Sequence, residues 1–218
     1  MATKRGMDPI LKGGVYGITA EEYSLGRSNL EVVSRMIASG IRVIQYREKE
    51  KSMGRKYLEC LKIREMTAKA GVTFIINDHA DLALLVGADG IHIGQDDLPP
   101  EKVRELVGAE MIIGLSTHSP EQAAAALSSE VDYIGVGPIF PTSTKKDVCD
   151  AVGLEYLEYA MKHISLPHVA IGGIKENNIA GVISRGARCV ALVTEIVGAE
   201  DIEAKVRSLM KLFSHKEV

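Results

Sequence analysis

The chain has 218 residues, of which 46% are apolar and 25% are charged, and its formal net charge is −3. A chain of this length without a Pro- or Ser-rich linker is typical of one α/β barrel domain. The small net charge excludes an extended basic surface for nucleic acid or an anionic membrane, and no apolar run approaches the roughly 20 residues that span a bilayer.

The N-terminal residues and the cysteines predict the compartment. Residues 1–12 lack the apolar core of a signal peptide, and we expect them to form a flexible N-terminal extension. Cys60, Cys149 and Cys189 are far apart and odd in number, which predicts neither a disulfide framework nor a cysteine metal site. The expected compartment is therefore the reducing cytoplasm.

Short β-branched runs alternate with helical patterns along the whole chain. The expected strands cover residues 13–19, 41–46, 73–78, 90–94, 111–116, 133–139, 168–172 and 189–194. The expected helices cover residues 30–39, 54–70, 79–86, 100–107, 153–163, 176–184 and 200–213, with a further helix beginning at Ser119-Pro120. Eight strand–helix units predict a single-domain (β/α)₈ TIM barrel over residues 1–218, with functional groups at the carboxyl ends of the strands.

A doubly wound open sheet is the structural alternative. Such a sheet would have fewer strands, or a glycine-rich dinucleotide fingerprint directly after its first strand. Gly13 and Gly14 come at the start of the first expected strand and Gly17 lies within it, so the sequence lacks that fingerprint. The barrel is therefore the preferred prediction.

Acidic residues follow two neighbouring strands of the predicted barrel. Asn77-Asp78 ends the third strand, and Asp96-Asp97 comes shortly after the fourth. Mg²⁺ prefers one or two carboxylates together with water and substrate phosphate oxygens, so these acids predict a magnesium site. The alternative is that Asp78 only caps the helix that follows it.

Basic and amide side chains follow the second strand. Gln45, Arg47 and Lys49 are two residues apart, so on an extended chain all three point the same way. The guanidinium of arginine and the ammonium of lysine both suit a phosphate ligand. The alternative is a solvated charge cluster, because acidic and basic neighbours surround them.

A second group of residues suits a separate phosphate. Thr142, Thr144 and Lys145 lie in the long loop over residues 140–152, and Gly172-Gly173 follows the seventh strand. The loops after strands seven and eight of such barrels often bind phosphate through backbone N–H groups. Two phosphate sites at one barrel mouth predict two phosphorylated substrates.

The chain resembles the thiamine phosphate synthase family over nearly its whole length. The resemblance rests on the motifs Gln45-x-Arg47-Glu48-Lys49, Asn77-Asp78-His79, His92-x-Gly94-Gln95-x-Asp97, Pro138-x-x-Pro141-Thr142-x-Thr144-Lys145 and Gly172-Gly173-Ile174. It implies condensation of 4-amino-2-methyl-5-(diphosphooxymethyl)pyrimidine with a thiazole phosphate, carboxylated or not, to give thiamine phosphate and diphosphate. The implied reaction is a dissociative, magnesium-assisted substitution, and a homo-oligomer is compatible with the family.

The resemblance also implies a role for each matching residue. Asp78 and Asp97 correspond to the Mg²⁺ ligands, and Arg47, Lys49 and Lys145 are the expected catalytic groups. His79 and His92 are expected to support the ligand-binding residues. The expected contacts to the pyrimidine diphosphate are Gln45, Arg47, Lys49, Asn77, Ser116 and Lys145, and those to the thiazole phosphate are Thr142, Thr144, Gly173, Val193 and Thr194.

Three single residues depart from the family pattern, and Cys149-Asp150-Ala151 replaces a more usual neutral stretch. Tyr46 stands where a smaller aliphatic residue is usual, Thr194 where serine is common, and Glu195 where a small neutral residue is expected. An acid beside a phosphate would repel it. From strand alternation we expect Glu195 to point away from the phosphate pocket.

Two rival functions fit the same barrel. A related thiazole tautomerase uses a histidine in a Ser-x-His-Ser stretch, and Ser116-Thr117-His118-Ser119 has that form. A non-catalytic sensor of thiamine precursors would also keep the binding residues. The acidic pair and Lys49 favour the synthase, because a tautomerase has no diphosphate to bind.

Overall fold

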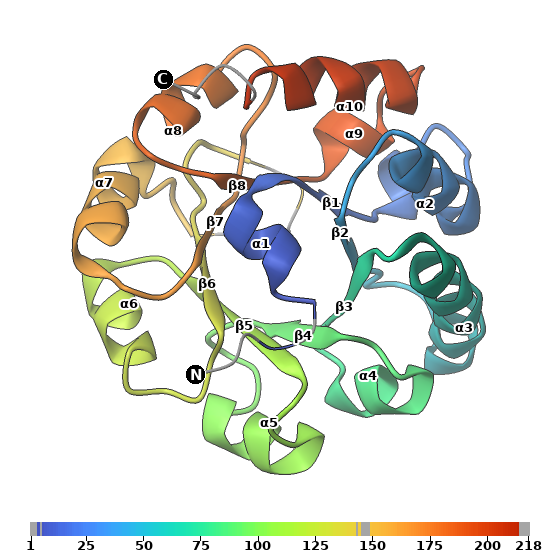
Figure 1. The fold of residues 1–218 in the computed structure, drawn as a ribbon, viewed down its shortest axis with the longest axis horizontal. Helices are drawn as coiled ribbons and strands as arrows, with labels where there is room; N and C mark the ends of the chain where they lie inside the picture. Colours follow the sequence, from blue (N-terminus) through green and yellow to red (C-terminus); the bar gives the residue numbers. More distant parts are fainter. Residues whose placement is uncertain (1–3, 5, 143, 145–148, 214–218) are drawn as a thin grey trace.

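The chain folds into a closed barrel of eight parallel strands in the order β1-β2-β3-β4-β5-β6-β7-β8, with helices around it (Figure 1). This architecture is seen in a computed structural model that describes residue 4, residues 6–142, residue 144 and residues 149–213. The predicted TIM barrel is therefore confirmed. The alternative of an open doubly wound sheet is excluded, because β1 pairs with both β2 and β8.

Each strand is short and is followed by helical structure. The strands are β1 (Gly14–Ile18), β2 (Val43–Tyr46), β3 (Thr73–Asn77), β4 (Gly90–Ile93), β5 (Ile112–Thr117), β6 (Tyr133–Val136), β7 (His168–Ala170) and β8 (Cys189–Leu192). The α-helices are α1 (Asp8–Lys12), α2 (Asn29–Ala38), α3 (Met53–Ala70), α4 (Ala80–Val86), α5 (Pro100–Val107), α6 (Pro120–Ala126), α7 (Gly153–His163), α8 (Ile179–Ser184), α9 (Thr194–Val197) and α10 (Ile202–Lys211). A 3₁₀ helix, η1 (Glu21–Tyr23), follows β1.

The strands separate two buried layers because alternate side chains point to opposite faces. Residues such as Ile44, Phe74 and Ile134 point outward and pack against the helices in one large cluster. Residues such as Ile75 and Ile112 point inward and form a second cluster inside the barrel. Burial on both faces explains why the strands read as nearly continuous apolar runs.

The N-terminal segment closes one end of the barrel, where we had expected a flexible extension over residues 1–12. Residues 8–12 form α1, which lies across the centre of the ring of strands (Figure 1). Met7 and Ile10 are 5% and 2% exposed and join the interior cluster. The expectation was therefore wrong for residues 8–12, because two apolar side chains among polar ones suffice to anchor a short helix.

The same end of the barrel carries partly buried ion pairs. Asp89, directly before β4, accepts hydrogen bonds from Arg64 and from the backbone N–H of Phe74, the latter at 2.8 Å. Asp132, directly before β6, is paired with Lys4 and Arg104 and accepts from the backbone N–H of Ile113. These contacts fix the starts of the strands, so we call this end the closed end of the barrel.

Several strands end earlier than the sequence predicts, and all these differences lie at the opposite end. β6 stops at Val136 and β8 at Leu192, where residues up to 139 and 194 were expected. Thr194 instead begins α9. The chain leaves the ladder there to form the loops of the barrel mouth.

Among the described residues, none of the helices is long and apolar enough to cross a membrane.

Candidate functional site

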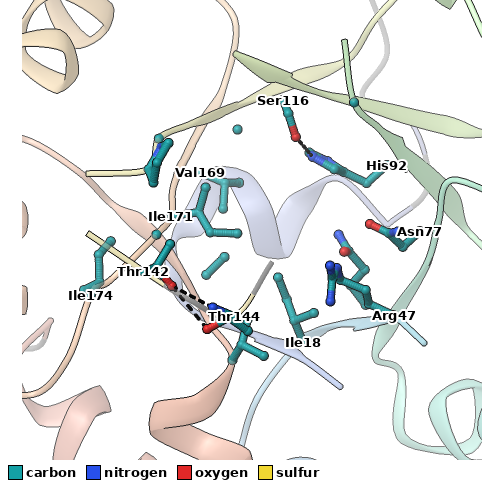
Figure 2. Close-up of a pocket in the computed structure, with 18 of the residues that line it drawn as sticks. Ile18, Arg47, Asn77, His92, Ser116, Thr142, Thr144, Val169, Ile171 and Ile174 are labelled. Carbon is teal, nitrogen blue, oxygen red and sulfur yellow. Dashed lines mark hydrogen bonds between the residues drawn. The ribbon is translucent and has the colours of Figure 1, made fainter. Parts of the chain in front are cut away.

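A cavity of about 680 Å³ opens at the carboxyl ends of the strands. Every predicted site residue that the structure describes lines it, and several are seen in Figure 2. Lys145, the remaining predicted residue, lies outside the described residues. Residues from β2, β3, β4, β5 and the loops after β6, β7 and β8 thus meet in one place, namely Gln45, Arg47, Lys49, Asn77, Asp78, Asp97, Ser116, Thr142, Thr144, Gly173, Val193 and Thr194.

Asp78 and Asp97 form a close pair of acids on one side of this cavity. The two carboxyl groups are close enough to influence each other's pKa, and Asp78 accepts a hydrogen bond from the ammonium of Lys49 at 2.5 Å. Burial would raise the pKa of Asp78, but the hydrogen bond and charge of Lys49 outweigh burial and lower that pKa. For Asp97, burial and the negative charge of Asp78 together raise the pKa. The pair therefore needs a proton or a cation between its oxygens.

The backbone aims both acids at the cavity. Asp78 adopts a φ of 63°, a left-handed conformation that aspartate tolerates better than most residues. Asp97 is held by a hydrogen bond from the backbone N–H of Gly94 at 2.7 Å. His79, and not Asp78, occupies the cap position before α4, so the alternative role of Asp78 as a helix cap does not apply.

This donor set suits a hard cation that keeps other oxygen ligands. Within the described part of the chain, no cluster of three or more His, Cys, Asp or Glu side chains could hold a metal ion. A complete protein cage is therefore missing, but Mg²⁺ needs only one or two carboxylates with water and phosphate oxygens. Two acidic side chains in direct contact, beside a cavity large enough for a phosphorylated ligand, meet that requirement.

Arg47 and Lys49 line the cavity next to the acids, while their neighbours point elsewhere. Glu48 accepts hydrogen bonds from the backbone N–H of Glu21 and the side-chain amide of Asn29, at 2.9 and 2.8 Å. The ammonium of Lys51 forms an ion pair with the carboxylate of Glu21. The neighbouring charges thus bind each other and hold the segment after β2, so the cluster is not merely solvated. Arg47 and Lys49 remain directed at the cavity.

Tyr46, one departure from the family pattern, belongs to the same supporting network. Its hydroxyl donates to Glu59 on α3 at 2.6 Å, and Glu59 also pairs with Lys51. The larger side chain therefore points away from the cavity and ties β2 to α3.

Backbone turns and hydroxyl groups form the other side of the cavity. Gly173 has a φ of 61°, and a Cβ there would lie 2.6 Å from the carbonyl oxygens of Phe140 and Pro141. The hydroxyl of Thr144 lies 3.2 Å from that of Thr142, and the two side chains are seen together in Figure 2. The side-chain amide of Asn178 donates to the carbonyl of Gly173 at 3.0 Å. Only glycine permits so close an approach of the two loops.

Glu195 points out of this region, as expected, but strand alternation is not the reason, because Glu195 lies in α9 and its neighbours Val193 and Thr194 both line the cavity. It does not line the cavity. Its carboxylate is 16% exposed and accepts hydrogen bonds from Lys205 on α10 at 3.1 Å and from the backbone N–H of Glu176 at 3.3 Å. A basic neighbour on the next helix therefore binds the acid.

Several polar residues that the sequence analysis did not assign to the ligand also line the cavity, and three of them stand out. Tyr16 and Tyr133 lie in the barrel interior, and His118 follows β5 with its Nδ1 2.6 Å from the carbonyl oxygen of Gly137. The tyrosines were hidden because each sits in an apolar strand. Their inward orientation could have been found from alternation, since each is two residues from another inward-facing position.

Comparison with known proteins identifies the family of this chain. Residues 15–196 match the family model described as thiamine monophosphate synthase. The chain is 71% identical over 217 residues to the thiamine-phosphate synthase of Pelotomaculum thermopropionicum, covering 100% of both chains. It is 53% identical over 199 residues to that of Lawsonia intracellularis, covering 91% of this chain and 92% of the other. The solved thiamine phosphate pyrophosphorylase from Pyrococcus furiosus superposes with a TM-score of 0.86 at 31% identity, covering 94% of this chain and 97% of that one.

Proposed function

The chain belongs to the thiamine monophosphate synthase family, and we propose that it joins a hydroxymethylpyrimidine diphosphate to a thiazole phosphate with release of diphosphate. The observation that carries the proposal is the division of one cavity into two sides, each with groups that suit a phosphate. Acids and basic side chains gather on the side of β2–β4, and a glycine turn with two hydroxyls lies on the side of β6–β8. A tautomerase with one phosphorylated substrate has no need of the first side.

The diphosphate side supports cleavage of the bond between the pyrimidine methylene and the diphosphate oxygen. Arg47 and Lys49 would bind the diphosphate and neutralise negative charge that grows as it leaves, and we assign the same role to Lys145. Two unit charges about 4 Å apart attract by roughly 4 kcal/mol at a surface-like dielectric. Several such contacts could supply a large part of the lowering of the barrier.

Asp78 and Asp97 are the residues that would hold Mg²⁺. When bound, the cation supplies further neutralisation of the departing diphosphate. Binding of the cation by Asp78 would compete with its ion pair to Lys49, and the Lys49 ammonium would then be available to the diphosphate. Asn77, which follows Ile76 on β3 and lines the cavity, is positioned to bind the same substrate.

The glycine side would hold the second substrate ready to react. Gly173, Thr142, Thr144, Val193 and Thr194 would bind the thiazole phosphate through backbone N–H groups and hydroxyls. Loss of diphosphate leaves a pyrimidine-methyl cation, which the lone pair of the thiazole nitrogen captures. This dissociative substitution needs no strong enzyme base, and the barrel contributes orientation and exclusion of water.

The test is condensation by the purified chain. The protein is incubated with both substrates and Mg²⁺, and thiamine phosphate and diphosphate are measured together. We expect the two products in equal amounts, loss of activity with excess EDTA, and recovery when Mg²⁺ is restored. Isomerisation of the thiazole alone would identify a tautomerase, and binding of both ligands without turnover would identify a sensor.

A further inference from the structure

A continuous chain of hydrogen-bonding side chains crosses the floor of the cavity. The amide of Gln45 donates to the hydroxyl of Tyr16 at 3.0 Å, and the hydroxyls of Tyr16 and Tyr133 lie 3.1 Å apart. The Tyr133 hydroxyl lies 2.9 Å from Nδ1 of His92, whose Nε2 lies 2.9 Å from the Ser116 hydroxyl (Figure 2 shows this last contact). This hydrogen-bond network links opposite walls of the barrel.

Two glycines make room for the centre of this chain. A Cβ at Gly114 would lie 2.2 Å from Cζ of Tyr133 and 2.5 Å from Nδ1 of His92. A Cβ at Gly135 would lie 3.3 Å from Cε1 of His92. The rings of His92 and Tyr133 pack with their centroids 5.4 Å apart, and Tyr133 is fully buried. The interior is therefore shaped to hold these two rings against each other.

The hydrogens of this network can be placed in one order that satisfies the four hydrogen bonds described above. The amide nitrogen of Gln45 can only donate, so the Tyr16 oxygen accepts and its own hydrogen goes to Tyr133. Tyr133 then donates to Nδ1 of His92. In the reverse order Tyr16 would accept twice, and its hydrogen would have no acceptor in the described part of the chain. Burial raises the pKa of both phenols, so each remains a neutral donor.

We propose that Tyr133 is a positioning residue that acts through His92. By donating to Nδ1 it holds the proton of the neutral ring on Nε2, which donates to Ser116 and leaves the Ser116 hydroxyl hydrogen to point into the cavity. Ser116 is then a donor for a ring nitrogen of the aminopyrimidine, the substrate in the proposed function on which this inference rests. Tyr133 thereby selects the hydrogen-bonding pattern that the pyrimidine meets.

The direct test removes only the hydroxyl, with Tyr133→Phe. In protein labelled with ¹⁵N-histidine, we expect the His92 signals, assigned by comparison with His92→Gln, to report proton occupancy of Nε2 in the unaltered chain. In Tyr133→Phe they should shift toward protonation of Nδ1. The kcat/KM for the pyrimidine diphosphate should fall about tenfold, as for loss of one buried hydrogen bond, while the KM for the thiazole phosphate changes less than twofold.

Tyr156→Phe is the matched control. The Tyr156 hydroxyl donates at 2.6 Å to Thr117, the neighbour of Ser116 on β5, but Tyr156 is a buried α7 residue outside the cavity. We expect this variant to lose similar stability and to keep the His92 signals and both kinetic constants. If Tyr133→Phe does not fold, Tyr16→Phe serves instead, because loss of the preceding donor should give a mixture of His92 tautomers.

Three results would overturn the inference. The first is protonation of His92 on Nδ1 in the wild-type protein. The second is unchanged His92 signals in Tyr133→Phe, and the third is an equal loss of kcat/KM in Tyr133→Phe and Tyr156→Phe. If the wild-type protein showed no condensation activity, the proposed function would be contradicted. The histidine spectra would still test the role of Tyr133.

Discussion

The two ends of the barrel use the same residue type in opposite ways. At the closed end, Asp89 and Asp132 each accept a backbone N–H and face an arginine. At the mouth, Asp78 and Asp97 face each other. A buried acid beside a guanidinium is compensated within the chain, whereas two acids in contact are compensated fully only when a cation binds. We therefore expect charges at the closed end to stabilise the fold, and charges at the mouth to serve the ligands of the proposed function.

The largest effect on activity should come from breaking the acidic pair with Asp78→Asn. Asparagine keeps the shape and suits the φ of 63°, but it removes the charge that would hold the cation. We expect kcat at saturating substrates to fall at least about 1,000-fold, since a bound cation contributes several kcal/mol to charge stabilisation. The melting temperature should change little, because Lys49 is 49% exposed and its ion pair is worth little to stability.

The measurement is a magnesium titration of turnover alongside a thermal melt. Wild-type turnover by Asp78→Asn at limiting Mg²⁺ would show that this carboxylate is not a ligand.

The corresponding change at the closed end, Asp132→Asn, should have the reverse effect. Asp132 is 17% exposed and pairs with Lys4 and Arg104, so its loss leaves a poorly compensated guanidinium. We expect the free energy of unfolding to fall by about 2–3 kcal/mol, because removing one member of a mostly buried ion pair leaves the other charge without compensation. Kinetic constants at 25 °C should stay within twofold. Denaturant unfolding and steady-state kinetics on one preparation test both statements, and a large fall in kcat without loss of stability would contradict the division of roles.

Two glycines sharpen the comparison because they have nearly the same backbone conformation. Gly173 at the mouth and Gly87, the cap of α4 near the closed end, have φ values of 61° and 63°. A Cβ at Gly173 meets two carbonyl oxygens at 2.6 Å, whereas one at Gly87 meets nothing within 4 Å. Alanine should therefore cost roughly 1–2 kcal/mol of backbone strain at either position. Only Gly173→Ala must also displace a loop.

We expect Gly173→Ala to raise the KM for the thiazole phosphate about tenfold, the effect of misplacing a few backbone hydrogen bonds to phosphate. Gly87→Ala should leave this KM unchanged. Initial rates at varied thiazole phosphate measure both, and equal KM values for the two variants would show that the glycine turn does not bind the phosphate.

The sequence predicted the barrel and the positions around its mouth well, and it predicted interactions within the chain poorly. Strand periodicity and polar strand ends located Asp78 and Gly173, because the ends of parallel strands must converge. Periodicity did not reveal α1, since Met7 and Ile10 are too few to form a pattern. Nor did it reveal the contact between Tyr133 and His92, which depends on room left by Gly114 on a third strand. Such contacts are set by the closed three-dimensional packing.

Glu195 is the residue for which the sequence raised a difficulty and the structure supplies the partner, and it should have the smallest effect. Its carboxylate is bound by Lys205 on α10 and does not line the cavity. We therefore expect Glu195→Ala to change the KM for the thiazole phosphate less than twofold. Stability should fall by at most about 1 kcal/mol, the usual value for a pair near the surface. A KM that drops severalfold, and drops further at low ionic strength, would mean that the acid faces the phosphate in solution. The charges of the mouth would then include one that opposes ligand binding, and the separation between the two ends would be incomplete.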